Sequence, residues 1–149
     1  NVISAQDMYD AVTEEAKNSD IIIKAAAVAD YTPLNVSDNK IKKKDGDMSI
    51  ALKRTKDIIG TLGEHKKEGQ FICGFSMETE NVIANSKDKL IKKNMDMIVA
   101  NNVKVAGAGF GTDTNVVTII TGEDNIELPM MSKEDVASKI LDFIMAKRR

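Results

Sequence analysis

The feature that most constrains the fold of this chain is a set of three short apolar runs separated by helical patterns. The runs are Ile21–Val28, Phe71–Phe75 and Met95–Ala100. The first, IIIKAAAV, is rich in β-branched residues and too short for an independent helix, so it predicts a strand buried on both faces, as in parallel sheets. Helices that alternate with such strands indicate one α/β domain with a mostly parallel sheet.

Helices are expected where apolar residues recur at helical spacing after a capping residue. Ser4, with Asp7 in the capping-box position, begins the first helix, Thr55 is expected to cap the second, and Ser132 caps the last. The expected helices cover residues 4–18, 55–66, 81–94 and 132 onward. Their inner faces are expected to carry Ile58, Ile59 and Leu62 in the second, Val82, Ile83, Leu90 and Ile91 in the third, and Val136, Ile140, Leu141 and Ile144 in the last.

The remaining segments are expected to form loops and short strands. We expect a long loop at 30–47, a strand at 48–52, a turn at 76–80, an irregular Gly-rich segment at 106–115, and a hairpin of 116–121 with 125–128. The predicted fold class is therefore α/β: a Rossmann-like, mostly parallel sheet flanked by helices, with an antiparallel β-hairpin at one edge.

Composition excludes several classes of protein. The chain of 149 residues is 42% hydrophobic and 30% charged with a net charge of −2, so we expect no attraction to nucleic acid or to an anionic membrane. No apolar run approaches the roughly 20 residues that span a bilayer. A single cysteine, Cys73, and a single histidine, His65, exclude an internal disulfide, argue against a zinc site and fit a reducing cytoplasm.

Candidate site residues follow the predicted strands. In open α/β sheets, ligands bind outside the carboxyl ends of the strands. The segments that follow the three strands here are Val28–Asp30, Gly74–Ser76 and Asn101–Asn102. We expect these three segments to converge on one site.

Charged residues near these segments suggest an anionic ligand, although each pattern also has a plainer interpretation. Four lysines fall within Lys40–Lys44, and they either neutralise a polyphosphate or form a solvated turn. Lys89 and Lys93 lie one helical turn apart and face either the ligand or the solvent. Lys24, inside a strand, needs an anionic partner or a route to water. Asp30 binds a ribose hydroxyl or a metal, or only caps a helix or shapes a turn.

The other motifs narrow the function only to a class of ligand. The chain has no dinucleotide-binding glycine motif, P-loop or catalytic triad pattern. Gly74 either admits a ligand to the backbone or serves packing, Cys73 is expected to be a buried inert thiol, and His65 is expected to be exposed. The residues therefore indicate an α/β domain that binds an anionic, nucleotide-like ligand. They leave open a Rossmann-like oxidoreductase or nucleotide-sugar enzyme, and a non-catalytic nucleotide-binding module.

A set of separated motifs narrows this choice by resemblance. In order along the chain stand AAAVADYTP at 25–33, KIKK at 40–43, GFSMETEN at 74–81, the pair Lys89 and Lys93, and an Ala-Asn-Asn-Val plus Gly-Phe segment at 100–110. Together they resemble the phosphopantothenoylcysteine synthetase family (phosphopantothenate–cysteine ligase), the ligase domain of the bifunctional coenzyme A biosynthesis flavoprotein. The resemblance spans nearly the whole chain.

This resemblance implies a two-step ligation. CTP, with Mg²⁺, activates the carboxylate of 4′-phosphopantothenate as an acyl-cytidylate and releases pyrophosphate, and the amine of cysteine then displaces CMP. Lysines and a metal suit this chemistry because negative charge builds up on the phosphates. The resemblance also implies a homodimer and a possible fusion to an FMN-dependent decarboxylase, with no flavin in this segment.

The resemblance also implies which residues form the nucleotide site. They are Lys24, Ala25, Ala26, Asp30, Lys40, Lys56, Asp57, Ile58, Ile59, Phe75, Lys89 and Lys93. Lys40 is implied to be catalytic, on a flap that closes over the phosphates and is poorly ordered without ligand, and Phe75 matches the cytosine pocket. Lys56 stands where the family usually has proline, so we expect backbone contacts from Lys56 to Ile59. No metal ligand is assigned.

One part of the family pattern does not occur in this sequence. It is the Gly-rich turn and the Asn-containing segment that supply much of the phosphopantothenate site. We therefore expect residues 1–149 to be a single domain that forms the C-terminal part of a ligase domain. By itself it is expected to bind CTP without ligating efficiently.

Overall fold

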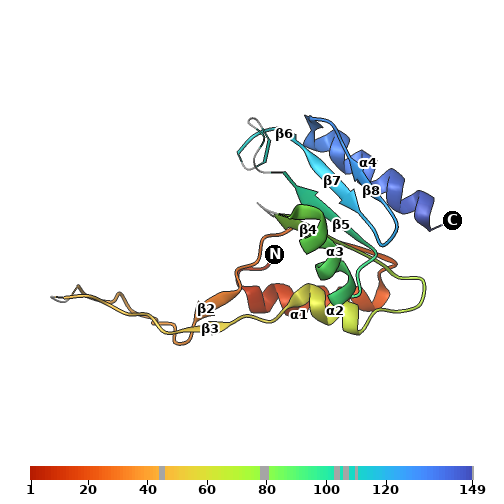
Figure 1. Cartoon of the computed structure of the whole chain (residues 1–149). Coiled ribbons are helices and arrows are strands. Elements are labelled where there is room, and N and C mark those ends of the chain that lie inside the picture. The colour runs from red at the N-terminus through yellow and green to blue at the C-terminus, as the bar shows by residue number, and fades with distance from the viewer. Residues whose placement is uncertain (44–45, 78–80, 103–104, 106–107, 110, 149) are drawn as a thin grey trace.

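The structure is a computed structural model that describes residues 1–43, 46–77, 81–102, 105, 108–109 and 111–148. Helices and strands alternate along the chain, as Figure 1 shows. The elements are α1 (Ala5–Glu15), a 3₁₀ turn (Ala16–Asn18), β1 (Ile21–Lys24), β2 (Tyr31–Pro33), β3 (Leu52–Arg54), α2 (Ile58–Glu64), β4 (Phe71–Met77), α3 (Val82–Lys92), β5 (Met97–Asn101), β6 (Thr114–Asn115), β7 (Val117–Ile120), β8 (Asn125–Glu127), β9 (Met131–Ser132) and α4 (Lys133–Lys147).

The main sheet contains five strands in the order β1-β4-β5-β7-β8. β1, β4 and β5 run parallel, with Lys24 opposite Gly74 and Gly74 opposite Ile98. β7 and β8 extend the sheet in antiparallel fashion and form the expected edge hairpin. The predicted fold class is confirmed.

Helices cover both faces of the sheet, α4 on one face and α1, α2 and α3 on the other (Figure 1). The buried residues of the first layer are Phe71, Cys73, Met97, Val99, Val117, Ile119, Val136, Ile140 and Ile144. Those of the second layer are Ile58, Leu62, Ile72, Leu90, Met95 and Ile98. β4 contributes alternate residues to the two layers, which is the pattern of a strand buried on both faces.

The helix caps were predicted correctly at two of three positions. Ser4 Oγ accepts from Asp7 N, and Asp7 Oδ2 accepts from Ser4 N at 2.9 Å, which completes the capping box. Ser132 caps α4 as expected. Thr55 does not cap α2; Asp57 does, because its Oδ1 accepts from Gly60 N at 3.0 Å.

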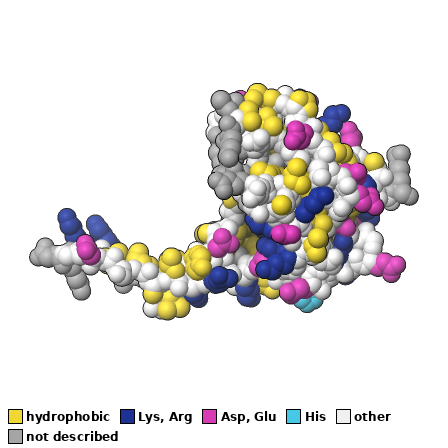
Figure 2. Space-filling view, viewed as in Figure 1, with side chains coloured by type: hydrophobic (Ala, Val, Ile, Leu, Met, Phe, Trp, Pro, Cys, Tyr) yellow, Lys and Arg dark blue, Asp and Glu magenta, His cyan; other side chains and the backbone are white. Residues whose placement is uncertain are grey.

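A two-stranded arm, residues 31–54, extends from the body (Figure 1). β2 and β3 pair antiparallel at its base, with Tyr31 opposite Arg54. The expected strand at 48–52 is therefore wrong in position, and the expected loop at 30–47 begins with a strand. Lys44 of the lysine cluster lies outside the described residues. Large apolar side chains on the arm are exposed: Leu34, Val36, Ile41, Met48, Ile50 and Leu52. Figure 2 shows them along much of its length.

Strand ends and inner faces also differ in places from the expectation. β1 ends at Lys24, four residues before the predicted end, and β4 continues through Ser76 and Met77 where a turn was predicted. Residues 78–80 of that turn lie outside the described residues. The expected inward positions of Ile83, Ile91 and Leu141 are wrong, because all three side chains are exposed. Each helix contacts its layer along one narrow stripe, such as Ser86 and Leu90 in α3.

The segment expected to be irregular contains a short strand. β6 pairs antiparallel with β9, and Thr114 lies opposite Ser132. Residues 106, 107 and 110 of that segment lie outside the described residues. Pairing across a gap of this length leaves no local pattern in the sequence.

Three expectations from composition can be compared with the structure. Cys73 is buried, and burial together with the charge of Asp96 raises the pKa of its thiol to about 12, so the thiol stays protonated. His65 is exposed, as expected. No helix in the described part of the chain has both the length and the apolar character needed to cross a membrane.

Candidate functional site

A cavity of about 490 Å³ opens beyond the carboxyl ends of β1 and β4, beside the base of the arm. Val28, Asp30 and the segment Gly74–Ser76 line it, so two of the expected strand ends converge. The third does not reach the cavity. Asn101 instead accepts a hydrogen bond from Asn115 Nδ2 at 2.8 Å, which ties the end of β5 to β6.

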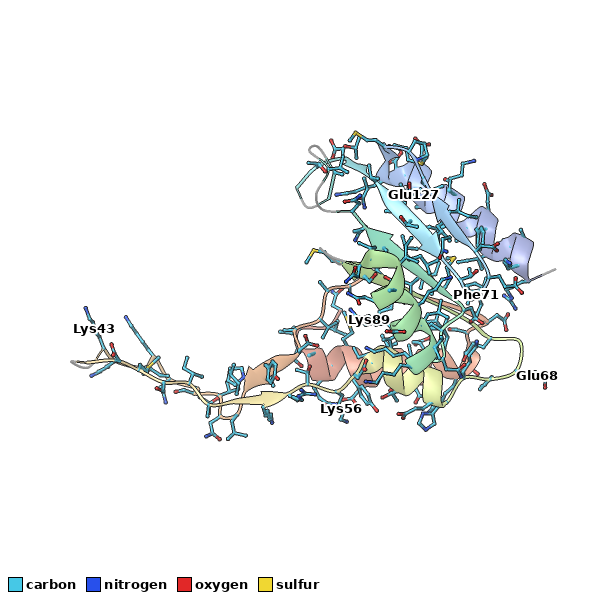
Figure 3. All side chains as sticks on the ribbon, viewed as in Figure 1. Lys43, Lys56, Glu68, Phe71, Lys89 and Glu127 are labelled. Atoms are coloured by element: carbon cyan, nitrogen blue, oxygen red, sulfur yellow. The ribbon has the colours of Figure 1, made fainter. Side chains whose placement is uncertain are left out.

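Most of the residues implied by the resemblance line this cavity. They are Lys24, Asp30, Lys56, Asp57, Ile58, Ile59, Phe75, Lys89 and Lys93. Ala25, Ala26 and Lys40 do not line it. Lys40 belongs to the outer part of the arm, and Figure 3 shows its neighbour Lys43 far from Lys89 on the body.

Lys24 is the last residue of β1, and its side chain is half-buried. Its Nζ donates to the carbonyl oxygen of Ala26 at 3.1 Å. Burial lowers the pKa of Lys24, the charge of Lys93 lowers it further, and the charges of Asp57 and Asp30 partly oppose both effects. The ammonium group therefore gains from any additional anion that enters the cavity.

An ion pair joins the start of α2 to the end of α3. Lys93 Nζ lies 2.9 Å from Asp57 Oδ2 and donates to Asp57 Oδ1 at 3.2 Å. Partial burial raises the pKa of Asp57, but the hydrogen bonds from Lys93 and from the Gly60 N–H outweigh it and leave this pKa below its usual value. Asp57 is therefore ionised at neutral pH.

The floor of the cavity depends on a missing side chain. A Cβ at Gly74 would lie 2.7 Å from Ile59 Cδ1 and 2.8 Å from Met95 Sδ. Gly74 therefore makes room for these two side chains, which supports its packing role, and it also borders the cavity; its role in admitting a ligand stays a prediction. Beside it, Ser76 Oγ and Ser86 Oγ are 3.1 Å apart and link β4 to α3.

The base of the arm forms one wall of the cavity, and the sequence did not reveal this. Thr55 N donates to Asp30 O at 2.9 Å, and Thr55 Oγ1 donates to Ala29 O at 2.7 Å, which fastens the arm to the segment after β1. Arg54 and Tyr31 also line the cavity, with the guanidinium carbon 5.9 Å from the ring centroid. Tyr31 belongs to the AAAVADYTP motif, so the sequence could have indicated it. Arg54 comes to the site only through the pairing of β2 with β3, which the sequence did not predict.

The side chain of Lys56 is oriented toward α1. Its Nζ lies 4.2 Å from the centroid of the Tyr9 ring, a distance suited to a cation–π interaction. Lys56 therefore connects the segment before α2 to the first helix. Its side chain already has a partner in the free protein.

The charges of the cavity favour a polyanionic ligand. Five cationic side chains and two carboxylates line it: Lys24, Arg54, Lys56, Lys89 and Lys93, with Asp30 and Asp57. The described residues hold no group of three His, Cys, Asp or Glu side chains that could bind a metal without help from a ligand. The cavity suits phosphate groups better than a neutral substrate.

Comparison with known proteins identifies the family. Residues 1–147 match the family described as DNA/pantothenate metabolism flavoprotein C-terminal domain. The chain is 53% identical over 146 residues to the coenzyme A biosynthesis bifunctional protein CoaBC of Bacillus subtilis (strain 168), covering 97% of this chain and 36% of that protein. The chain thus spans about a third of the length of this relative.

Solved structures agree with this assignment. The C-terminal domain of coenzyme A biosynthesis bifunctional protein CoaBC is 45% identical, with a TM-score of 0.78 over 98% of this chain and 65% of that chain. A Cab2 mutant in complex with phosphopantothenate-cysteine is 18% identical, with a TM-score of 0.75 over 99% of this chain and 51% of that chain, and so shares the fold. The chain therefore belongs to the family of DNA/pantothenate metabolism flavoprotein C-terminal domains.

Proposed function

We propose that this chain supplies the nucleotide site of a phosphopantothenate–cysteine ligase in coenzyme A biosynthesis. In the proposed reaction, CTP and 4′-phosphopantothenate give an acyl-cytidylate and pyrophosphate, and cysteine then gives 4′-phosphopantothenoylcysteine and CMP. The observation that carries the proposal is the lysine-rich cavity at the strand ends, in a chain of this family. The cavity has a size and a charge that suit a nucleoside triphosphate.

The residues of the cavity match the demands of this chemistry. The carboxylate of the acyl substrate attacks the α-phosphorus, and the bond to the pyrophosphate oxygen breaks. Lys24, Lys89 and Lys93 hold the phosphates and offset the negative charge that accumulates on the leaving pyrophosphate. No enzyme nucleophile is required, which agrees with the buried and protonated thiol of Cys73.

We propose that Mg²⁺ accompanies the nucleotide. Asp30 lines the cavity, and Mg²⁺ is commonly held by one or two carboxylates together with substrate phosphates, whereas Asp57 is already paired with Lys93. When bound, the ion would neutralise charge on the triphosphate. The protein residues orient the phosphates in either case.

The assembly around the chain is also a proposal. We propose that residues 1–149 form the C-terminal part of a ligase domain that acts as a homodimer in the cytoplasm. We also propose a fusion to a decarboxylase, which would be consistent with the word bifunctional in the name of the relative. The exposed apolar side chains of the arm support a dimer because they need a partner surface. Sedimentation of the full-length protein measures its mass directly.

Release of pyrophosphate tests the proposed reaction. The full-length protein is supplied with 4′-phosphopantothenate and, in separate assays, CTP, ATP or NAD. We expect pyrophosphate release with CTP and 4′-phosphopantothenate, and product formation only after cysteine is added. NAD reduction would indicate an oxidoreductase, and CTP binding without pyrophosphate release would indicate a non-catalytic module. Efficient ligation by the isolated 149-residue chain would contradict the proposal that it is one part of the catalytic unit.

A further inference from the structure

Asp57 places a negative charge among cations that a phosphate ligand would need. Its Oδ2 lies 2.9 Å from Lys93 Nζ, and its charge also acts on Lys24. Carboxylate and phosphate oxygens are both strong acceptors for an ammonium group. A ligand phosphate and Asp57 therefore compete for the same lysines.

We propose that Asp57 is an exchangeable counter-ion of the nucleotide site, paired with Lys93 in the free protein and replaced by phosphate oxygens when a polyphosphate binds. The inference rests on the proposed function, because the competing ligands are the triphosphate of the substrate and the pyrophosphate product. Its consequence is that Asp57 weakens polyphosphate binding and speeds the departure of pyrophosphate. The side chain of Asp57 therefore acts in the release of the pyrophosphate product.

The charge of Asp57 offsets the repulsion between two lysines that line the cavity. The charge of Lys93 lowers the pKa of Lys24, so these two cations repel each other when no anion lies between them. The charge of Asp57 raises this pKa. Without it, of the two carboxylates whose charges raise the pKa of Lys24, Asp30 alone would remain.

The geometry allows the exchange without loss of the helix cap. Asp57 Oδ1 accepts from Gly60 N at 3.0 Å, whereas Oδ2 makes the shorter contact with Lys93. The side chain of Asp57 is 55% exposed and that of Lys93 is 29% exposed, so water and ligand reach the pair from the cavity. A phosphate can take the Lys93 contact while Oδ1 continues to cap α2.

Two substitutions separate the charge from the cap. Asp57→Asn keeps a side-chain oxygen for Gly60 N and removes the negative charge, and Asp57→Ser does the same with a hydroxyl. The matched control is Glu123→Gln, which removes an equal charge from an ion pair with Lys147 at 3.0 Å, outside the cavity. Thermal unfolding of each variant checks that the fold is retained.

The decisive measurement is calorimetric binding of pyrophosphate to the full-length protein. We expect the dissociation constant for pyrophosphate to be lower in Asp57→Asn and Asp57→Ser, on the order of fivefold, because pyrophosphate no longer competes with a partly exposed ion pair for Lys93. Pyrophosphate inhibition of the reaction should strengthen in parallel, and Glu123→Gln should match the wild type. Unchanged or weaker binding in both Asp57 variants would overturn the exchange, since it would mean that Asp57 only holds Lys93 in position.

A second readout needs no ligand. Removing Asp57 removes a charge that raises the pKa of Lys24, so this pKa should fall further in Asp57→Asn, as measured by NMR of labelled lysine side chains. An unchanged pKa would refute the counter-ion role even if pyrophosphate binding changed. If the wild-type protein binds neither CTP nor pyrophosphate, the proposed function itself fails. If the wild type ligates normally and the variants bind pyrophosphate as it does, only this inference fails.

Discussion

Lys24 combines three properties that a surface lysine lacks: a position at the end of a strand, partial burial and a second lysine close by. Burial and the charge of Lys93 lower its pKa, and the charges of Asp57 and Asp30 do not fully restore it. A group of this kind changes its charge at a lower pH than other lysines do. The charge of the cavity is therefore sensitive to pH.

This sensitivity should appear in nucleotide binding. As pH rises through the lowered pKa, Lys24 loses its proton and the cavity loses a positive charge, so the affinity for CTP should decrease. Lys24→Arg keeps the charge and should move this decrease to higher pH. Lys24→Gln should remove the decrease, because it binds CTP more weakly than the wild type below the pKa of Lys24 and about as weakly above it. The measurement is the CTP dissociation constant from about pH 7 to about pH 10. A wild-type profile in Lys24→Arg would contradict the assignment.

Among the helices, the junction of α2 with the end of α3 positions Lys93. Gly63 of α2 packs directly on the backbone of Lys93: a Cβ there would overlap its carbonyl oxygen and lie 2.8 Å from its carbonyl carbon. Asn94 Nδ2 donates to Gly63 O at 2.9 Å and closes the junction. The absence of a side chain at Gly63 therefore allows the two helices to approach this closely.

Gly63→Ala should separate these helices. Because the atoms it meets are backbone, the added methyl group cannot be accommodated by a rotamer change, and we expect a loss of about 2 kcal/mol in the free energy of unfolding. Gly122→Ala is the control, since a Cβ at Gly122 meets nothing within 4 Å. Urea unfolding of both variants measures the difference. Equal stability would show that the junction relaxes freely.

The elements that the sequence predicted well are those with local patterns. β4, β5 and the β7–β8 hairpin have apolar runs or alternation within a few residues, and Ser4 and Ser132 cap helices with a short-range motif. The β2–β3 pairing joins residues about twenty positions apart, and every side chain of β3 is exposed, so no apolar pattern indicates it. At the start of α2, Thr55 and Asp57 are both suitable capping residues; Asp57 caps the helix, whereas Thr55 Oγ1 donates to Ala29 O, a contact that the sequence does not indicate.

The candidate site follows the same division. Lysines and aspartates in recognisable motifs were named from the sequence, and most of them line the cavity. Arg54 and Thr55 were missed because they come to the cavity through the arm, whose strands could not be paired from the sequence. Asn101 and Asn102 were included because they follow a strand, but β6 occupies that end of the sheet.

For the molecule as a whole, the arm holds its lysines away from the cavity: Lys40 does not line it, and Figure 3 shows Lys43 of the arm far from Lys89. The resemblance nevertheless implies that Lys40 is catalytic. We expect Lys40→Gln in the full-length protein to lower the ligation rate on the order of a hundredfold, as for the loss of one donor to a developing charge. The fold should be unaffected because Lys40 is exposed. Lys53→Gln, at an exposed lysine of β3, is the control. Full turnover in Lys40→Gln would refute a catalytic role for this segment.

Movement of the arm has its own test. Trypsin should cleave first after Lys40, Lys42 or Lys43, which are exposed on the extended arm. CTP together with 4′-phosphopantothenate should slow this cleavage if the arm closes over the substrates, while cleavage elsewhere proceeds at an unchanged rate. Mass spectrometry of the early fragments identifies the sites. Equal cleavage with and without substrates would contradict closure.

β1 has a consequence for handling the chain in solution. Within the described residues it pairs with β4 on one side only, and Ile23 is 39% exposed. The open side presents unpaired backbone N–H and C=O groups beside apolar side chains, which is a template for another strand. A strand from elsewhere in a longer protein would cap this edge. Left uncovered, the edge would recruit further copies of the chain, so aggregation at high concentration would show that this edge is open to pairing.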